Sequence, residues 1–527
     1  MPKTARILGQ RFLLACLCSG SFSVAVAASA QSPGSDQGQV PAHSQHGNAL
    51  AVLAKAPKPI PDIESGRIKT GLPFKNPPMI SSRHGVLEMR LNARAKPVTI
   101  SGKKVNARVY SASAFGKDYP YSFMPPTIVL DPGDNLKVNL TNWLGEPTNL
   151  HTHGFFISPT GNQDNIFVDL TSSKSFLYNY FLPKDISPGS YWYHPHYHPL
   201  VEEQVFGGLS GFIYIRGLEA FLPADLRGVT QQFLGLKDFQ VDRTNSIPSQ
   251  NINSDSPTNR TINGLVQPAM TMRPGETQLW HLGNLSADIW YDLEIPGLTF
   301  NVIGVDGNPV DQVQEASTLL MPPGKRFDVL VQTKNVATYQ LITREMNTGP
   351  EGDTYPRTLM ATLNVKGTAV SPVALPKQMK PLEDLANATV TRRRIFELSE
   401  NDTTGQFFIN EKEFNANQVD ATPVTGTVEE WVFRNRSQEL HPIHVHVNDA
   451  QVISVNGIPQ QVNSWLDTIP IPYATQNDAG VSVPGEVVMR FKFRDFIGPY
   501  VFHCHILAHE DNGMMTVINV TSPDSEK

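Results

Sequence analysis

A ten-residue segment that occurs three times constrains the fold of this 527-residue chain more than any other feature. Each copy begins with glycine and ends with asparagine, and the copies occupy residues 133–142, 275–284 and 426–435. Their starting points are 142 and 151 residues apart. A single domain spans about 100–200 residues, so the repeat predicts three related domains.

A second repeated segment, eight residues long, follows each copy. Residues 189–196 read Gly-Ser-Tyr-Trp-Tyr-His-Pro-His, and residues 498–505 read Gly-Pro-Tyr-Val-Phe-His-Cys-His. Residues 337–344, Ala-Thr-Tyr-Gln-Leu-Ile-Thr-Arg, keep the tyrosine but lack histidines. The middle domain is therefore expected to share the fold and to lack the chemistry of its neighbours.

Apolar and polar residues alternate with a period of two along much of the chain. Leu136, Val138 and Leu140 alternate with polar residues, and residues 487–494 repeat this pattern. Pro and Gly interrupt such runs at short intervals, and long helical stripes are scarce. These features predict an all-β protein built from Greek-key sandwiches or barrels.

The N-terminal segment has the pattern of an export signal. Basic residues, a short apolar stretch and an Ala28-Ser29-Ala30 cleavage site predict a signal peptide over residues 1–30, and hence a periplasmic or secreted protein. Residues 31–82 are expected to form a flexible lead-in. No later stretch is long and apolar enough to predict a membrane span. The formal net charge of −6 argues against a nucleic-acid partner.

Cys504 is the single cysteine beyond the signal peptide, and it lies between His503 and His505. Side chains alternate between the faces of a strand, so the cysteine and the two histidines are expected to point in opposite directions. Thiolate and imidazole are both suitable ligands for copper. One strand is thus predicted to touch two metal sites and to carry electrons between them.

Ten histidines fall into four clusters that follow the repeat. Nine and eleven positions after the repeat asparagine lie His151 and His153 in the first copy, and His444 and His446 in the third. The same steps reach Leu293 and Ile295 in the middle copy. With the second repeated segment, the outer domains supply eight histidines, which we expect to surround several metal ions at their interface. The middle domain is expected to be a spacer and part of the wall.

The third domain alone adds His441, Cys504, His509 and Met514. Two imidazoles, a thiolate and a distant thioether describe a blue-copper electron-transfer site. Zinc is the main alternative for a single His-x-His pair, and a core position is the alternative for Met514. Neither alternative accounts for the whole set.

The four clusters resemble the signatures of three-domain multicopper oxidases of the laccase group. The resemblance extends over residues 85–520 and is strongest for the ending His509-Glu-Asp-Asn-Gly-Met-Met515, which is similar to bacterial laccases, cuprous oxidases and bilirubin oxidases. It implies three cupredoxin-like Greek-key β-sandwich domains, at residues 83–217, 218–390 and 391–527, of which the second lacks copper ligands.

The resemblance also implies four copper ions. The type 1 copper would take His441, Cys504, His509 and axial Met514. The type 2 copper would take His151 and His444. The two type 3 coppers would take His153, His194 and His505, and His196, His446 and His503.

By this resemblance the protein is expected to couple four one-electron oxidations to the reduction of O2 to two waters. Its partners would be O2 and a small-molecule or metal-ion electron donor, and the protein is expected to be a monomer. Cys504, His503 and His505 would carry the electrons from a type 1 site near the surface.

The donor is not specified by the ligands. The methionines are scattered rather than gathered in one insertion, so phenols and aromatic amines are favoured as donors. Oxidation of Cu(I), Fe(II) or Mn(II) is the alternative. A non-catalytic copper-binding or structural envelope protein is the least favoured interpretation, because no ligand is missing.

Two carboxyl groups are candidates for proton supply. Asp164 and Glu510 occupy positions where the resemblance implies acids near the metal cluster, although Asp164 also fits a simple turn. His198 is expected to lie just outside the ligands or in a channel, and Glu202 is expected at the surface.

Overall fold

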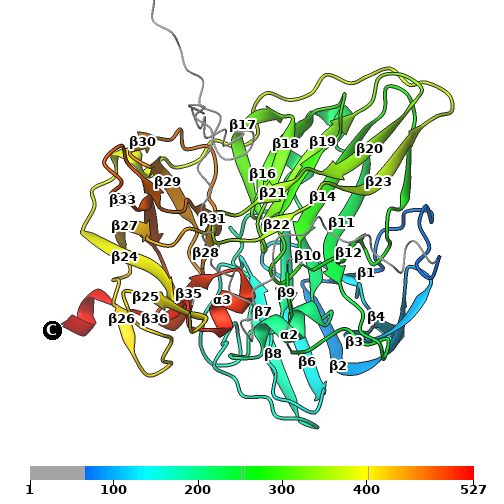
Figure 1. Ribbon diagram of the computed structural model, residues 1–527. Coiled ribbons are helices and arrows are strands. Elements are labelled where there is room, and N and C mark those ends of the chain that lie inside the picture. The colour runs from blue at the N-terminus through cyan, green and yellow to red at the C-terminus, as the bar shows by residue number, and fades with distance from the viewer. Residues whose placement is uncertain (1–65, 251, 255, 402, 527) are drawn as a thin grey trace, which may run out of the picture.

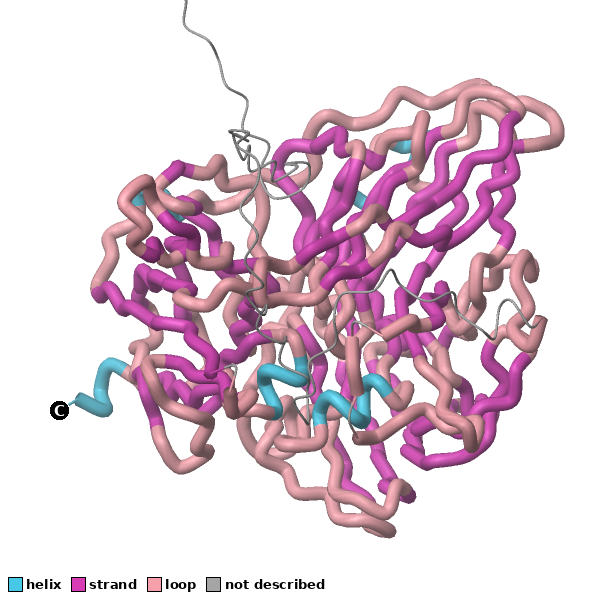
Figure 2. Tube along the Cα trace, in the orientation of Figure 1, coloured by secondary structure: helices cyan, strands magenta, loops and turns pink. Residues whose placement is uncertain are grey.

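The computed structural model describes residues 66–526 except 251, 255 and 402. The predicted signal peptide and residues 31–65 of the lead-in lie outside the described residues. Strands predominate over helices throughout the described chain (Figure 2). They form three two-sheet sandwiches, which confirms the predicted all-β class and the three related domains (Figure 1).

Domain 1 consists of two five-stranded sheets. The first contains, in spatial order, β1 (Met79–Ser81), β5 (Thr127–Leu130), β10 (Gly211–Ile215), β9 (Gly189–His194) and β7 (His151–His153). The second contains β4 (Lys117–Ser122), β3 (Lys103–Ala114), β2 (Val86–Ile100), β6 (Asn135–Trp143) and β8 (Ser175–Phe181).

Domain 2 pairs a six-stranded sheet with a five-stranded one. The larger sheet contains β12 (Asn259–Ile262), β11 (Thr230–Phe239), β14 (Thr277–Asn284), β19 (Arg326–Gln332), β16 (Phe300–Val305) and β17 (Asn308–Ala316). The smaller contains β13 (Ala269–Met272), β23 (Thr358–Val365), β20 (Ala337–Thr343), β15 (Tyr291–Glu294) and β18 (Thr318–Met321).

Domain 3 repeats the arrangement of domain 2. Its larger sheet contains β25 (Gln406–Ile409), β24 (Arg392–Asn401), β27 (Thr427–Asn435), β34 (Gly485–Phe493), β29 (Ala450–Val455) and β30 (Ile458–Pro459). Its smaller sheet contains β26 (Val419–Ala421), β36 (Met515–Val520), β35 (Gly498–Cys504), β28 (His441–Val445) and β31 (Thr468–Ile471).

Short elements complete the described chain. Two small hairpins are formed by β21 (Met346–Asn347) with β22 (Thr354–Tyr355) and by β32 (Thr475–Gln476) with β33 (Ser482–Val483). The helices are α2 (Val201–Phe206), α3 (Leu507–Asp511) and the 3-10 turns η1 (Leu218–Phe221), η2 (Ala224–Leu226), η3 (Leu385–Asn387) and η4 (Pro523–Glu526). No helix among the described residues is long and apolar enough to cross a membrane.

The three repeat copies form β6, β14 and β27, which occupy equivalent places. Each lies between a parallel neighbour (β2, β11 or β24) and an antiparallel neighbour (β8, β19 or β34). In β6 the expected alternation holds, because Leu136, Val138 and Leu140 are buried between half-exposed polar residues. Each sandwich thus encloses its own apolar core.

The repeat asparagine has the same structural role in all three domains. Asn142, Asn284 and Asn435 are completely buried. Each side-chain oxygen accepts the backbone N–H two residues later, at 2.9, 3.1 and 3.0 Å. Each Nδ2 donates to a backbone carbonyl, such as that of Glu146 at 2.7 Å or Glu439 at 2.6 Å. The repeat is therefore conserved among the domains because the asparagine closes the loop after a central strand.

The end of the predicted lead-in is not a free segment. Residues 66–82 lie against domains 1 and 2, which corrects the expectation of flexibility for this part. Strand β1 pairs in parallel with β5. Ile68 is buried, and Phe74 packs against the core of domain 2. This apolar burial gives the segment a fixed place that its Pro- and Gly-rich sequence did not indicate.

Domains 1 and 3 meet at the two short helices. Figure 1 shows α3, in red, beside α2, and domain 2, in green, above both. The backbone N–H of Glu202 in α2 donates to Asp511 Oδ2 of α3 at 2.8 Å. The backbone N–H of Ala508 in α3 donates to Asp288 Oδ1 of domain 2 at 3.1 Å. All three domains are thus joined around α3.

Candidate metal centres

A mononuclear set of donor atoms lies inside domain 3. His441 Nδ1 and His509 Nδ1 lie 3.6 and 3.8 Å from Cys504 Sγ, and 3.2 Å from each other. All three side chains are buried. Strand β28 begins at His441, β35 ends at Cys504, and α3 carries His509. Two sheet strands and one helix therefore bring together the three donors predicted from the sequence.

Neighbouring groups orient the donors of this mononuclear set. Ser437 Oγ lies 2.7 Å from His441 Nε2, so the other ring nitrogen is left to face Cys504. The ring of Phe407 stacks on His509 at 3.9 Å. Met514 is buried, and its backbone N–H donates to His509 O at 2.9 Å while its carbonyl accepts from Cys504 N at 3.0 Å. Burial lowers the pKa of His441 to about 3 and keeps its ring neutral, as a metal ligand requires.

The histidines of the mononuclear set, expected near the surface, are themselves covered. His441 is 0% and His509 is 1% exposed. Glu439 Oε2 lies 3.5 Å from His509 Nε2. The hairpin β21–β22 of domain 2 holds this carboxylate, because Thr348 Oγ1 donates to Glu439 Oε1 at 3.0 Å and Leu440 N donates to Thr348 O at 2.7 Å. A carboxylate thus occupies the outer edge of His509.

A histidine cluster lies between domains 1 and 3. All of its members are buried. Within it, the Nε2 atoms of His196, His446 and His503 lie 3.1 to 3.3 Å apart, which is close enough for one ion to contact all three. The cluster consists of His151, His153, His194, His196, His444, His446, His503 and His505.

The repeat symmetry is preserved within the cluster. His151 pairs with His194 across β7 and β9, and His444 pairs with His503 across β28 and β35. Leu293 and Ile295 occupy the corresponding steps in domain 2 and are buried core residues. The middle domain therefore keeps the strand arrangement and fills the ligand positions with apolar side chains.

Several donor atoms of the histidine cluster are buried without a hydrogen-bond partner among the described residues. They are His151 Nε2, His153 Nδ1, His194 Nε2, His444 Nε2 and both ring nitrogens of His505. Burying polar atoms without partners is costly, and bound metal ions would satisfy these nitrogens. Burial lowers the pKa of His194 and of His444 to about 3, so these rings are neutral donors. The cluster fits metal ions with a preference for imidazole.

One of the predicted ligand groups matches the local geometry directly, and another less closely. His196, His446 and His503 form a compact group as expected. His153 and His194 group instead with His151. The ring of His505 lies 5.0 Å from that of His153 and 5.7 Å from that of His194, measured between centroids. The division of these histidines among individual ions stays a prediction.

Asp164 lies on the outer side of the histidine cluster. Its Oδ2 is 2.8 Å from His151 Nδ1, and its Oδ1 accepts from Thr152 N at 2.8 Å and Thr152 Oγ1 at 3.1 Å. Burial raises the pKa of Asp164 to about 7, although the Thr152 hydrogen bonds oppose this shift. Its contacts are therefore those of a residue that fixes the ring of His151.

Glu510 and the backbone of Cys504 lie on the outer side of His503. Glu510 is completely buried, and its oxygens lie 2.9 Å from His503 Nδ1 and 3.3 Å from His196 Nδ1. The same His503 Nδ1 is 2.9 Å from the carbonyl oxygen of Cys504. Strand β35 ends at Cys504, so His505 lies just beyond it, where its N–H donates to Pro442 O at 2.6 Å. The predicted link between the two groups of donors is present.

His198 and Glu202 lie one layer further from the ligands. His198 Nδ1 is 3.7 Å from Asp511 Oδ1, and its ring contacts Phe414. Glu202 is half-buried in α2 rather than at the surface, and its Oε1 is enclosed. Burial, with Asp288 and Asp511 nearby, raises its pKa well above the usual range. The sequence Val-Glu-Glu-Gln gave no sign of this, because contacts with domains 2 and 3 create the burial.

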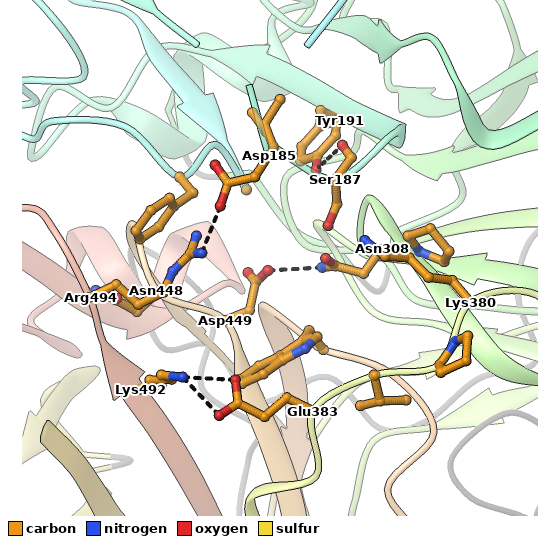
Figure 3. Close-up of a pocket in the computed structure, with 17 residues that line it drawn as sticks. Asp185, Ser187, Tyr191, Asn308, Lys380, Glu383, Asn448, Asp449, Lys492 and Arg494 are labelled. Carbon is orange, nitrogen blue, oxygen red and sulfur yellow. Dashed lines mark hydrogen bonds and ion pairs between the residues drawn. The ribbon is translucent and has the colours of Figure 1, made fainter. Parts of the chain in front are cut away.

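A cavity of about 280 Å³ lies where the three domains meet (Figure 3). Its wall includes Gly154, which follows His153, and Asp449, which accepts from Asn308 Nδ2 at 2.8 Å. Two ion pairs frame it, Arg494 with Asp185 at 3.0 Å and Lys492 with Glu383 at 2.7 Å. The cavity therefore touches the chain next to the histidine cluster at Gly154, and its lining mixes apolar side chains with these four charged ones.

Known proteins share this arrangement of domains and donors. Three family models described as multicopper oxidase match residues 116–220, 232–368 and 383–524. The chain is 25% identical to the multicopper oxidase mco of Staphylococcus haemolyticus over 77% of this chain and 83% of that protein. It is 27% identical to a laccase of Bacillus stratosphericus over 62% of this chain and 71% of that protein.

Among solved structures, a multicopper oxidase from Campylobacter jejuni described as a metallo-oxidase superposes with a TM-score of 0.74. The two sequences are 25% identical, and the match covers 86% of this chain and 96% of the Campylobacter jejuni chain. Together with the buried donors in domains 1 and 3, these matches identify the chain as an oxidoreductase of the multicopper oxidase family.

Proposed function

We propose that the protein holds four copper ions and couples four one-electron oxidations to the reduction of O2 to two waters. One would lie in the mononuclear set and three in the histidine cluster, as the resemblance implies. The observation that carries the proposal is the end of β35, where Cys504 belongs to the mononuclear set and the adjacent His503 belongs to the cluster. A storage protein has no need of such a link.

Bound copper would supply one-electron redox chemistry at both places. The chain supplies the connection. From Cys504 Sγ the route follows the side chain and backbone of Cys504 to His503. The contact of 2.9 Å between Cys504 O and His503 Nδ1 shortens this route by bypassing covalent bonds. His503 Nε2 then faces His196 and His446.

Glu510 is the proposed proton-holding group. It is buried between the outer nitrogens of His196 and His503, next to the histidine cluster and away from bulk water. A positioned carboxyl group can take up and release protons where solvent cannot reach. Asp164, by contrast, is proposed to position His151, because its contacts are with that ring and Thr152.

The donor is proposed to be a metal ion, namely Cu(I), Fe(II) or Mn(II). This reverses the order favoured by the sequence. A carboxylate at the outer edge of His509 favours a cationic donor over a neutral aromatic one, and the covering hairpin β21–β22 would have to move for either class. A carboxylate 3.5 Å from His509 Nε2 can bind a cation and lies in line for electron transfer into the mononuclear set.

Phenols and aromatic amines are the second candidate class. The similarity to a protein named laccase supports them. Such donors would require the hairpin β21–β22 to move away from Glu439.

Oxygen uptake by the copper-loaded protein tests both proposals. Wild type, Glu439→Gln and the control Glu88→Gln, which alters an exposed ion pair with Lys137, are compared with Cu(I), Fe(II), Mn(II) and a phenol. We expect Glu439→Gln to lower metal-ion turnover by roughly 10-fold, equivalent to about 1.4 kcal/mol, and to spare the phenol. An equal loss with every donor would contradict the metal-ion proposal. A wild type that consumes no oxygen with any donor would contradict the oxidase proposal itself.

A further inference from the structure

The middle domain reaches the histidine cluster although it contributes none of its histidines. Arg326, the first residue of β19, forms two hydrogen bonds with Asp467 of domain 3, from Nη1 to Oδ1 at 2.7 Å and from Nη2 to Oδ2 at 2.6 Å. Both side chains are buried, at 0% and 1% exposure. This geometry is the planar, two-point pairing at which arginine is stronger than lysine.

A turn in domain 2 places Arg326. Lys325 N donates to Pro322 O at 3.1 Å, and Gly324 lies in between with a φ of +85°. Proline followed by glycine at the two central positions is typical of a type II turn. A Cβ at Gly324 would lie 3.0 Å from the His505 ring and 3.2 Å from the His153 ring. The backbone of domain 2 thus packs directly on two histidines of the cluster.

A second turn of domain 2 supports the same contact. Asp306 and Gly307 connect β16 to β17 with φ values of +49° and +79°, as expected for an Asp-Gly hairpin turn. Asp306 Oδ2 accepts from Lys325 Nζ at 2.8 Å and from the backbone N–H of Asp467 at 3.2 Å. Asp467 is therefore held through its side chain by Arg326 and through its backbone by Asp306.

Asp467 in turn contacts one histidine from each outer domain. Its Oδ1 lies 3.2 Å from His153 Nε2, and its carbonyl oxygen lies 2.8 Å from His444 Nδ1. The remaining nitrogens, His153 Nδ1 and His444 Nε2, are buried without partners among the described residues. An acceptor on one ring nitrogen fixes the proton there and leaves the lone pair of the other nitrogen for a metal.

Gly154 shows how little space this arrangement leaves. A Cβ at Gly154, which directly follows His153, would lie 2.6 Å from both Arg326 Nη2 and Asp467 Oδ2. Glycine in the His-Thr-His-Gly motif is therefore required by an ion pair between the two other domains. This is a contact that no spacing within the motif reveals.

We propose that domain 2 sets the orientation and tautomers of His153 and His444 through the Arg326–Asp467 ion pair. Arg326 and Asp467 are thus positioning residues for the copper ions of the histidine cluster. The proposal rests on the function proposed above. It replaces the expectation of a spacer with a direct role for the middle domain in assembling a site between its neighbours.

The test compares copper-loaded Arg326→Met, Asp467→Asn and Arg326→Lys with wild type. The matched control is Arg344→Met, which removes an arginine–aspartate pair within domain 2, Arg344 Nε to Asp292 Oδ2 at 2.8 Å. Copper per chain is measured during competition with a chelator, and the type 1 and type 2 signals are followed by electron paramagnetic resonance. A positioning role predicts roughly 10- to 100-fold weaker retention of the copper in the histidine cluster in Arg326→Met and Asp467→Asn, measured as a fall in copper per chain. Arg326→Lys should recover part of the loss, and the type 1 signal should persist throughout.

Two outcomes would overturn the proposal. One is a folded Arg326→Met or Asp467→Asn protein that retains the copper of the histidine cluster as wild type does. The other is parallel loss of type 1 copper and of the copper in the histidine cluster, which would indicate general destabilisation. If Arg326→Met does not fold, the nearly isosteric Asp467→Asn decides. A wild type without any type 2 signal would instead refute the proposed function, so the two failures are distinguishable.

Discussion

The carboxylate of Asp164 lies 2.8 Å from Nδ1 of His151 and accepts two further hydrogen bonds from Thr152. All three donors need an acceptor. An asparagine offers one oxygen and one NH2 group, so it cannot accept from both His151 and Thr152. An asparagine at position 164 would therefore lose the acceptor that faces His151 or the one that faces Thr152.

We predict that Asp164→Asn lowers copper affinity at His151 almost as much as Asp164→Ala, by roughly 10- to 100-fold. The type 2 signal in electron paramagnetic resonance during chelator competition measures this. Asp185→Asn, at an exposed residue, serves as the control. If Asp164→Asn retained copper as wild type does, the proposed orientation of His151 would be wrong.

Cys504→Ser should remove the link between the two groups of donors. A serine hydroxyl does not provide the soft thiolate that a blue-copper site needs. We expect the blue colour to vanish, the copper content to fall by one ion per chain, and oxygen uptake with every donor to cease. Absorption spectra, copper analysis and an oxygen electrode measure these three effects.

A matched control for this prediction is Met515→Leu, which alters a buried neighbour of the mononuclear set without changing its donors. Colour and turnover should survive in that variant. Continued turnover in Cys504→Ser would contradict the proposed electron route.

Sequence periodicity predicted the repeat strands, the sandwiches and the candidate ligands, because each depends on spacing within one segment. The covering of the mononuclear set could not be predicted in this way. His509 lies within a recognisable motif, but the hairpin that holds Glu439 over it comes from another domain, about 160 residues earlier in the chain. Whether the side chains of a motif are exposed depends on how the domains pack together, which the spacing within the motif does not specify.

The same limit applies to the histidine cluster. His153 and His444 are recognisable from repeat spacing, whereas Arg326 and Asp467 are ordinary charged residues until the domains meet. The Asp306-Gly307 dipeptide between two apolar runs was a readable hairpin signal. It did not reveal that the turn enters an interface. Side-chain contacts between domains produce no periodic pattern within one segment, so they cannot be predicted from the sequence of that segment.

The repeat asparagines provide a test of the shared fold. Replacing Asn284 with alanine would remove two donated hydrogen bonds, to Ile289 O at 2.8 Å and Met321 O at 2.9 Å. Leaving such buried carbonyls without partners costs about 1–3 kcal/mol each. We predict a loss of about 2–4 kcal/mol in the unfolding free energy for Asn284→Ala, with losses of similar size for Asn142→Ala.

Chemical denaturation of the copper-free protein measures these losses as shifts of the unfolding midpoint. Asn139→Ala is the control, because Asn139 points outward from the same strand as Asn142 and is half-exposed. That change should stay within about 0.5 kcal/mol. Equal effects at Asn139 and Asn142 would contradict the role assigned to the repeat asparagine.

Asp288 should make the stability of the protein depend on pH. Burial raises its pKa to about 7, although hydrogen bonds from the backbone of α3 oppose the shift, and Asp238 and Asp353 add to it. The folded protein therefore binds this proton more tightly than the unfolded chain, in which an aspartate titrates near pH 4. Its contribution is full below about pH 4 and is lost as pH rises through about 7.

Asp288→Asn keeps an oxygen for the N–H of Ala508 and removes the titrating group. The unfolding free energy of wild type relative to Asp288→Asn should therefore fall between pH 5 and pH 8 and level off at higher pH. Thermal unfolding of the copper-free proteins at several pH values measures this difference, with Asp185→Asn as the exposed control. Parallel curves for wild type and Asp288→Asn would show that Asp288 is already ionised in the folded protein. The contact between domain 2 and α3 would then be that of an ionised carboxylate at the start of the helix that carries His509.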